Sequence, residues 1–178
     1  DPTSAAERVR GIQRFHIDQR GWCDIGYHFL IGQDGQVYQG RADEQRSGAH
    51  VGRHNANNVA IGFLGNFEEI EPPQNMLDAS IRMVAWLSST YGITLDRDHV
   101  RGHREWDGAS TACPGANMVP RLTDIVEAAK ADPDAPLSLA ISFVAPEELF
   151  NTGTSAGVAD AFEGDTLETE LAVTNTSN

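Results

Sequence analysis

A long amphipathic segment constrains the fold of this chain more than any other feature of the sequence. Between residues 74 and 91, apolar side chains recur every three to four positions, which is typical of a helix with one buried face. Pro72-Pro73 precedes this segment, and Gly92 stands where a glycine usually caps a helix C-terminus. The apolar run Val59 to Leu64 predicts a buried strand just before it. We therefore expect a sheet against which this helix packs.

Further elements are predicted on either side of this pair. Ser4-Ala5-Ala6-Glu7 is a capping box, and it predicts a helix that ends near Gln19. The apolar run Ile25 to Ile31 predicts a strand, and the turn residues 33–35 predict that residues 36–39 return as the second arm of a hairpin. Residues 119–130 predict a last helix. The expected fold is α/β, with a central mixed β-sheet flanked by helices.

The composition changes after residue 131, which suggests a domain boundary. Residues 132–136 read Asp-Pro-Asp-Ala-Pro and predict a linker. Residues 137–143 and 168–174 alternate with a period of two, as strands do. We expect residues 1–131 to form one domain and residues 137–178 to begin a separate all-β module. Because two or three strands are unstable alone, we expect this module to continue past Asn178.

Charge and hydropathy exclude two classes of partner. The chain has 13 Lys and Arg against 26 Asp and Glu, a net charge of −13, whereas nucleic-acid binding depends on basic patches. No apolar run approaches the roughly 18 residues needed to span a bilayer. We expect a monomer that binds neither nucleic acid nor a membrane.

A histidine and a cysteine stand close together in the second half of the chain. Nine residues separate His103, in Gly102-His103-Arg104-Glu105, from Cys113, in Thr111-Ala112-Cys113-Pro114-Gly115. Imidazole and thiolate are ligands that zinc prefers, and a structural zinc site normally takes four protein ligands. The pair therefore suggests a catalytic zinc with an open position, provided that a third ligand exists.

A long loop is the second candidate region. Residues 41–58 show no periodicity and contain Gly48, His50, Gly52, His54 and Asn55. Loops longer than about 12 residues inside compact domains are usually functional or disordered.

Several motifs, in order and spacing, resemble the peptidoglycan recognition protein family, the type 2 N-acetylmuramoyl-L-alanine amidases. The resemblance covers roughly residues 3 to 130. The matching segments are Trp22 to Gly32, Gly48 to Gly52 with Asn55, Ile61 to Phe67, Gly102 to Arg104, and Ala112 to Gly115.

The resemblance implies a Zn2+ hydrolase that binds its metal through two histidines and one cysteine. His103 and Cys113 match the second histidine and the cysteine. The first histidine is expected in a His-His-Thr-like segment, at the end of a strand that precedes the first helix. We expect that strand upstream of Asp1, so that this chain supplies two of three ligands. A disulfide between Cys23 and Cys113 is the competing interpretation, and we expect Cys23 to be a buried thiol instead.

The resemblance also implies roles for four other residues. The matching tyrosine lies over the zinc-bound water, which suggests a catalytic role for Tyr27; the alternative is core packing on one face with Phe29 and Ile31. Thr111 is a candidate oxyanion donor or a loop threonine that bonds to local backbone. His50 matches a position that lines the substrate groove, or it is a surface residue. Asn55 is a candidate substrate contact or makes an Asx-type turn.

The remaining polar residues of interest have plainer interpretations. We expect His16 to be packed or half-exposed on the first helix, and His28 to point away from the face of Tyr27. His54 and His99 are expected at the surface. Glu105 either accepts a hydrogen bond from the ring of His103, as second partners of metal histidines do, or is an ion that faces solvent.

The function implied by the resemblance is zinc-dependent hydrolysis of the amide bond between N-acetylmuramic acid and L-alanine in peptidoglycan. Tyr27 and Thr111 would stabilise the oxyanion. The alternative is a non-catalytic module that only binds peptidoglycan, although such members typically lose the cysteine ligand. Because peptidoglycan (muramyl peptides) lies outside the cytoplasm, we expect a secreted or cell-surface protein.

Overall fold

The computed structural model describes residues 4–41, 47–132, 141–143 and 168–174. Six strands form one sheet in the order β4-β6-β3-β1-β2-β5. The strands are β1 (Phe29–Ile31), β2 (Val37–Gln39), β3 (Asn58–Leu64), β4 (Val100–Gly102), β5 (Ile141–Phe143) and β6 (Glu168–Thr174). The helices are α1 (Ala5–Asp18), α2 (Gln74–Tyr91) and α3 (Arg121–Ala131), with short 3-10 turns η1 (Gly52–His54) and η2 (His103–Glu105).

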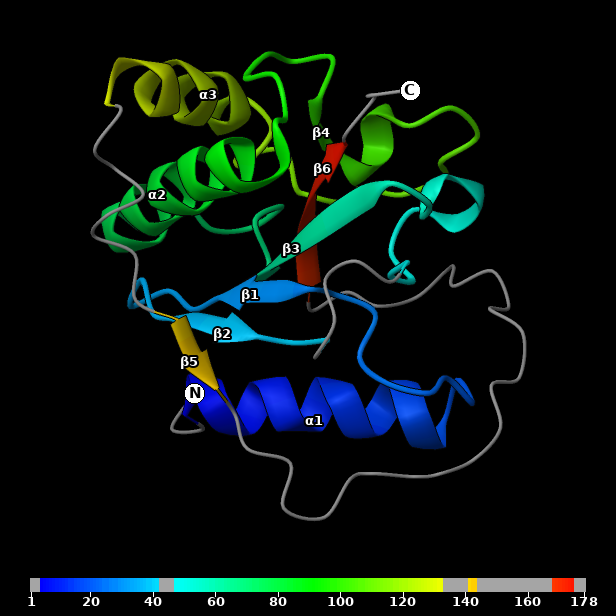
Figure 1. The fold of residues 1–178 in the computed structure, drawn as a ribbon. Coiled ribbons are helices and arrows are strands. Elements are labelled where there is room, and N and C mark those ends of the chain that lie inside the picture. The colour runs from blue at the N-terminus through cyan, green and yellow to red at the C-terminus, as the bar shows by residue number, and fades with distance from the viewer. Residues whose placement is uncertain (1–3, 42–46, 133–140, 144–167, 175–178) are drawn as a thin grey trace.

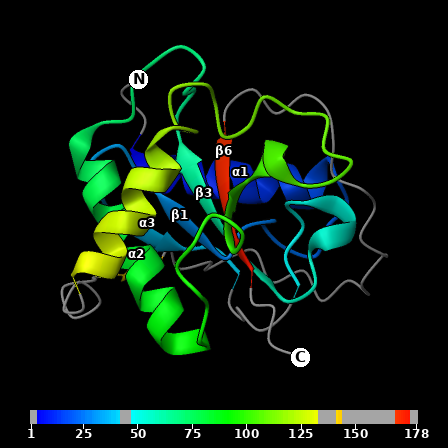
Figure 2. The ribbon, with the colours of Figure 1, turned by 90° about the horizontal axis from the view of Figure 1, so that it is seen from above.

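Helices cover both faces of the sheet, as the sequence predicts. Helices α2 and α3 lie together on one face and α1 lies on the other (Figure 1), and the view from above shows α2 and α3 side by side (Figure 2). The larger core cluster lies between the sheet and α2 and α3, and includes Phe29, Ile61 and Met83. A smaller cluster under α1 includes Val9 and Leu30. The mixed sheet flanked by helices is therefore confirmed.

The ends of the first two helices follow from local chemistry. At the start of α1, the backbone N–H of Glu7 donates to Ser4 Oγ (3.2 Å), and the backbone N–H of Ser4 donates to Glu7 Oε2 (3.0 Å). This reciprocal pair satisfies two amides that the first turn leaves without partners. Helix α2 ends at Gly92, whose φ of 67° is left-handed. Both boundaries were predicted from the sequence.

The hairpin and the parallel pair also form where the sequence predicts strands. Strand β1 pairs antiparallel with β2, with Phe29 opposite Gln39, and parallel with β3, with Phe29 opposite Ile61. Strand β1 is shorter than the apolar run 25–31 that predicts it, because residues 25–28 lie outside the ladder. Strand β4 runs parallel to β3, because both pair antiparallel with β6. Parallel strands are usually joined by a crossover that contains a helix, and α2 is the helix between β3 and β4 in the chain.

The described strands of the C-terminal region, β5 and β6, pair with the main sheet, and the separate all-β module stays a prediction because most of residues 137–178 lie outside the described residues. Strand β6 pairs antiparallel with both β3 and β4, and β5 pairs parallel with β2. The backbone N–H and C=O groups of β5 and β6 thus pair with strands of the main sheet rather than with each other. The linker residues 133–136 and the remainder of 137–178 lie outside the described residues. In the described part of the chain, no helix has both the length and the hydropathy needed to cross a bilayer.

Candidate functional site

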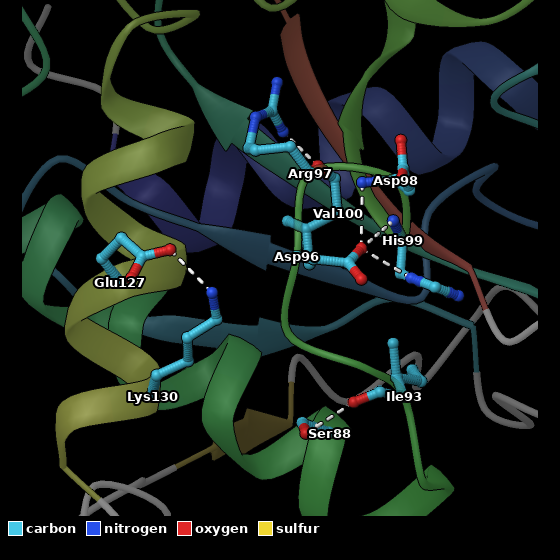
Figure 3. Close-up of polar contacts among 9 residues, drawn as sticks. All are labelled: Ser88, Ile93, Asp96, Arg97, Asp98, His99, Val100, Glu127 and Lys130. Atoms are coloured by element: carbon cyan, nitrogen blue, oxygen red, sulfur yellow. Dashed lines mark hydrogen bonds and ion pairs between the residues drawn. The ribbon is translucent and has the colours of Figure 1, made fainter.

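The turn that precedes β4 is held by one carboxylate. Asp96 Oδ1 accepts hydrogen bonds from the backbone N–H groups of Asp98 and His99, both at 2.9 Å, and lies 2.6 Å from His99 Nδ1 (Figure 3). The Arg97 guanidinium donates to the carbonyl of Val100, the first residue of β4. These contacts fix where β4 begins and therefore where His103, directly after its last residue, lies.

His103 opens η2 and is largely buried, with 7% of its surface exposed. Burial lowers its pKa to about 4, so that the imidazole is neutral at pH 7. Neutral imidazole is the form that binds a metal ion. Glu105 is an ion-paired residue, because its carboxylate lies 2.6 Å from Arg97 Nη2 and accepts from the backbone N–H of Gly102 at 2.6 Å.

Backbone contacts bring Cys113 beside the His103 segment. The backbone N–H of Arg104 donates to the carbonyl of Cys113 at 2.9 Å. Pro114 packs against Gly102 so closely that a Cβ at Gly102 would lie 2.6 Å from Pro114 Cδ. Glycine at this position therefore allows the two segments to meet.

Neither cysteine is in a disulfide, which excludes the Cys23–Cys113 bridge. Cys113 is half-buried, whereas Cys23 is exposed. The prediction that Cys23 is buried is therefore wrong. Its neighbour Trp22 turns inward instead and packs on the His16 ring, with 4.5 Å between centroids.

The donor set fits part of a zinc site. His103 offers a neutral imidazole and Cys113 a sulfur that is not in a disulfide, which are donors of the kinds that zinc prefers. Among the residues that the structure describes, no group of three or more His, Cys, Asp or Glu side chains is placed to hold a metal ion. These residues thus supply two donors of the required kind.

Thr111 bonds to its own loop. Its Oγ1 accepts a hydrogen bond from the backbone N–H of Cys113 at 3.1 Å. This is the local role that the sequence offers as an alternative, and it holds the loop that carries Cys113. The hydroxyl proton is not used by this bond, so that Thr111 retains a donor.

Tyr27 lies on the α1 side of the sheet. It is buried in the smaller core cluster, its ring centroid is 5.7 Å from that of His16, and its Cγ would lie 3.2 Å from a Cβ at Gly62. The prediction that Tyr27 shares a face with Phe29 and Ile31 is wrong, because those two residues belong to the larger cluster. Strand β1 begins at Phe29, so that its alternation does not extend back to residue 27.

The loop before β3 is organised around Asn55. Its side-chain oxygen accepts hydrogen bonds from the backbone N–H groups of His50 (2.9 Å) and Val51 (2.8 Å). This is the turn role that the sequence offers for Asn55, and it fixes the backbone of His50.

His50 is a buried imidazole rather than a surface one. It is 1% exposed, and neither of its ring nitrogens has a hydrogen-bond partner of good geometry among the residues that the structure describes. Burial is the main cause that lowers the pKa of His50 to about 3, and the charge of the nearby His28 lowers it further. A contact with the Asn58 side chain raises this pKa but does not offset the burial. The His28 ring stands edge-on at 5.7 Å between centroids. The charge of His103 also lowers the pKa of His50, which indicates that both histidines share one region.

The other histidines have structural partners. His16 Nδ1 accepts from the backbone N–H of Gly26 at 3.2 Å, which confirms a packed histidine. His28 Nδ1 accepts from the backbone N–H of Ala60 at 3.0 Å. His54 and His99 are half-buried.

The loop that contains η1 and the loop that follows η2 contact each other. Arg53 Nη2 lies 3.3 Å from an oxygen of the Asp107 carboxylate, and His54 Nε2 lies 3.1 Å from the Asp107 carbonyl oxygen. The His54 and Trp106 rings are in contact, tilted by 33° to each other, with 5.2 Å between centroids. The sequence does not single out Arg53, Trp106 or Arg41, because arginine and tryptophan residues in polar loops form no motif or periodic pattern that would predict a contact. Arg41, at 8% exposed, is the most unusual of them.

Comparison with known proteins places these features in a family. The model of the N-acetylmuramoyl-L-alanine amidase family matches residues 2–116. Peptidoglycan recognition protein 1 of Bos taurus is 38% identical over 118 residues, which are 66% of this chain and 60% of that protein. The chain thus spans less than two thirds of the length of this curated relative.

Two solved structures are similar in fold as well as in sequence. The N-acetylmuramoyl-L-alanine amidase LysC from Clostridium intestinale is 34% identical, with a TM-score of 0.56 over 74% of this chain and 76% of that chain. Human PGRP-IβC in complex with glycosamyl muramyl pentapeptide is 33% identical, with a TM-score of 0.54 over 62% of this chain and 65% of that chain. Since the family model matches more than half of its residues, the chain belongs to the N-acetylmuramoyl-L-alanine amidase family.

Proposed function

We propose that this chain hydrolyses, with Zn2+, the amide bond between N-acetylmuramic acid and L-alanine in peptidoglycan. The observation that carries the proposal is the junction of the β4–η2 segment with the Cys113 loop. There a neutral, buried His103 and a half-buried Cys113 that forms no disulfide lie on backbone segments that are hydrogen-bonded to each other. Membership of the amidase family supports the same reaction.

His103 and Cys113 would hold the zinc, as ligands of the two types present here. A bound zinc supplies a Lewis acid for the amide carbonyl and an activated water. In this proposal the Tyr27 phenol and the free hydroxyl proton of Thr111 donate to the oxyanion that develops on the carbonyl. His50 binds substrate through a ring nitrogen, and Asn55 supports it by holding its backbone.

The proposed ligands are muramyl peptides. The similarity to the human protein solved with glycosamyl muramyl pentapeptide supports this class. Because peptidoglycan lies outside the cytoplasm, we infer a secreted or cell-surface protein. We also propose that it acts as a monomer.

One observation favours a second candidate, a module that binds peptidoglycan without cleaving it. Within the described ranges, no third zinc-binding side chain joins His103 and Cys113. A site with two protein ligands would bind zinc weakly, and recognition would then be the activity that is left.

Replacement of one cysteine at a time tests the proposal. We expect Cys113→Ser to lower zinc occupancy, measured by elemental analysis, and to reduce the release of L-alanyl peptides from muramyl peptides by at least about 100-fold, as for loss of a metal ligand. Cys23→Ser is the matched control, because Cys23 is an exposed free thiol. Unchanged peptide release by Cys113→Ser would exclude the zinc mechanism. Binding without release by the unmodified chain would support the recognition module.

A further inference from the structure

The loop that carries Cys113 is held by Arg104, the residue directly after His103. Arg104 Nη2 donates a hydrogen bond to the carbonyl of Ala112. The backbone N–H of Arg104 donates to the next carbonyl, that of Cys113, at 2.9 Å. Because Arg104 follows His103 directly, these two bonds tie the candidate zinc-binding segments to each other.

Glu68, in the turn that follows β3, completes this arrangement. Its Oε1 lies 2.6 Å from Arg104 Nη2 and accepts a hydrogen bond from the backbone N–H of Ala116 at 3.0 Å. Ala112 and Ala116 lie on opposite sides of Cys113 in the sequence. The Glu68–Arg104 ion pair therefore bonds to the backbone on both sides of the cysteine, through the guanidinium on one side and the carboxylate on the other.

Backbone contacts fix the turn that carries Glu68 against the same loop. Phe67 is fully buried, and its carbonyl accepts from the backbone N–H of Asn117 at 3.0 Å. The φ of Gly115 is 98°, and a Cβ at this residue would lie 2.5 Å from the carbonyl carbon of Phe67. Only glycine allows so close an approach of the two backbones. The carboxylate of Glu68 thus extends from a turn that is itself fixed to the Cys113 loop.

Stability alone is a weak explanation for this ion pair. The side chains of Arg104 and Glu68 are 32% and 41% exposed, and exposed ion pairs contribute little to the free energy of unfolding. Glu71, in the same turn, forms a comparable exposed pair with Arg121 at 3.5 Å. That pair joins the turn to the start of α3, whereas the Glu68–Arg104 pair also bonds to the backbone around Cys113.

We propose that Glu68 and Arg104 are positioning residues of the zinc site, which hold Cys113 where it shares a metal ion with His103. Groups that orient metal ligands typically change the metal affinity by about 10- to 100-fold when they are replaced. This inference rests on the proposed function, because it takes His103 and Cys113 as zinc ligands. Both positioning residues act through the backbone of the loop, and neither contacts the substrate in this proposal.

The first experiment uses the metal-free chain, so that it depends on neither zinc binding nor hydrolysis. A thiol reagent modifies Cys113 and Cys23 in the same molecules, and mass spectrometry of the peptides gives the two rates separately. We expect Glu68→Ala to speed the modification of Cys113 by roughly 10-fold, because the loop loses charge-assisted hydrogen bonds that hold it closed. The rate at the exposed Cys23 should stay the same.

Glu71→Ala is the matched control for this experiment, because it removes the same charge from the same turn. It should change neither rate. Circular dichroism checks that each variant is folded, and if Glu68→Ala does not fold, Glu68→Gln, which loses the ion pair but keeps an oxygen for the Ala116 amide, takes its place. A Cys113 rate that is the same in the unmodified chain and in the Glu68 variant would overturn the proposal.

The second experiment measures zinc affinity by competition with a chromophoric chelator. Removal of a positive charge close to a bound cation should strengthen zinc binding by Coulomb's law, whereas loss of positioning should weaken it. We expect Arg104→Met to lower the zinc affinity by about 10-fold or more, and Arg104→Lys, which keeps the charge and a donor, to lower it less. An equal or higher affinity of Arg104→Met would overturn the proposal. Glu68→Ala should weaken zinc binding more than Glu71→Ala does.

The outcomes separate this inference from the proposed reaction. If the chain binds zinc and releases peptide, but neither the Cys113 rate nor the zinc affinity depends on the Glu68–Arg104 pair, the reaction stands and the positioning role is excluded. If both quantities depend on the pair but the zinc-loaded chain releases no peptide, the positioning role stands and hydrolysis is excluded. No zinc binding by the unmodified chain would exclude both.

Discussion

Three of the four buried histidines in the described residues, His16, His50 and His103, stand out at the scale of single residues. Burial is the first cause of the lowered pKa of each, to about 4, about 3 and about 4 respectively. Each ring is therefore neutral at pH 7 and costs stability once it must take a proton inside the fold. The sequence predicts the ligand role of His103 from its motif, but it gives no indication that His50 is buried.

The pH dependence of unfolding follows from these residues. A histidine with a pKa near 4 when folded and about 6.5 when unfolded binds more protons in the unfolded chain between those two values. The free energy of unfolding should therefore be highest above pH 6.5 and fall as the pH decreases toward 4, by roughly 3 kcal/mol for His16. Urea unfolding at pH 7, 6, 5 and 4 measures this. His16→Gln, which keeps an acceptor for the Gly26 amide, should flatten the decrease, and an unchanged slope would contradict the prediction.

At the scale of elements, helix boundaries were predicted well and strand boundaries less well. Helix ends are set by nearby residues, such as the Ser4–Glu7 capping box and Gly92, so that they are visible in the sequence. The apolar run 25–31 contains only a three-residue strand, because pairing depends on where the partner strands lie. Because β1 begins only at Phe29, Tyr27 lies outside its alternation and faces α1, whereas the sequence predicts that it shares a face with Phe29 and Ile31.

Two glycines test this difference between local conformation and packing. A Cβ at Gly92 or at Gly11 would meet no atom within 4 Å, but only Gly92 has a positive φ, of 67°. We expect Gly92→Ala to lower the free energy of unfolding by about 1 kcal/mol, because alanine is strained there. Gly11→Ala, in the middle of α1, should raise it by roughly 0.5–1 kcal/mol. Thermal unfolding of both variants measures this, and effects of the same sign would contradict the assignment of the cap.

At the scale of the whole molecule, the sheet joins segments that are far apart in the sequence. Strand β6 lies between β3 and β4, and β4 pairs with β6 in the described part of the sheet. His103 follows β4 directly, so that a strand from the far end of the chain supports the candidate zinc site (Figure 1).

Disruption of β6 should therefore reach the site. Leu171 stands opposite both Ile61 in β3 and Gly102 in β4, and Leu171→Pro removes a backbone donor in the middle of the sheet. We expect faster amide exchange in β3 and β4 and a zinc affinity lower by about 10-fold or more, the effect of losing support for a metal ligand. Leu171→Val, which keeps the N–H, is the control. Amide protection in β3 and β4 that is unchanged by Leu171→Pro would contradict this role of β6.

The sequence by itself determined the features that depend on neighbouring residues. These are the three helices, the hairpin, the α/β class and the His103 and Cys113 motifs that carry the family resemblance. Only the tertiary structure decided which sheet β5 and β6 join, which face Tyr27 occupies, and that Arg41 and His50 are buried. Pairing and burial are properties of residues brought together from distant parts of the chain, and a pattern read along one segment contains no information about what lies across from it.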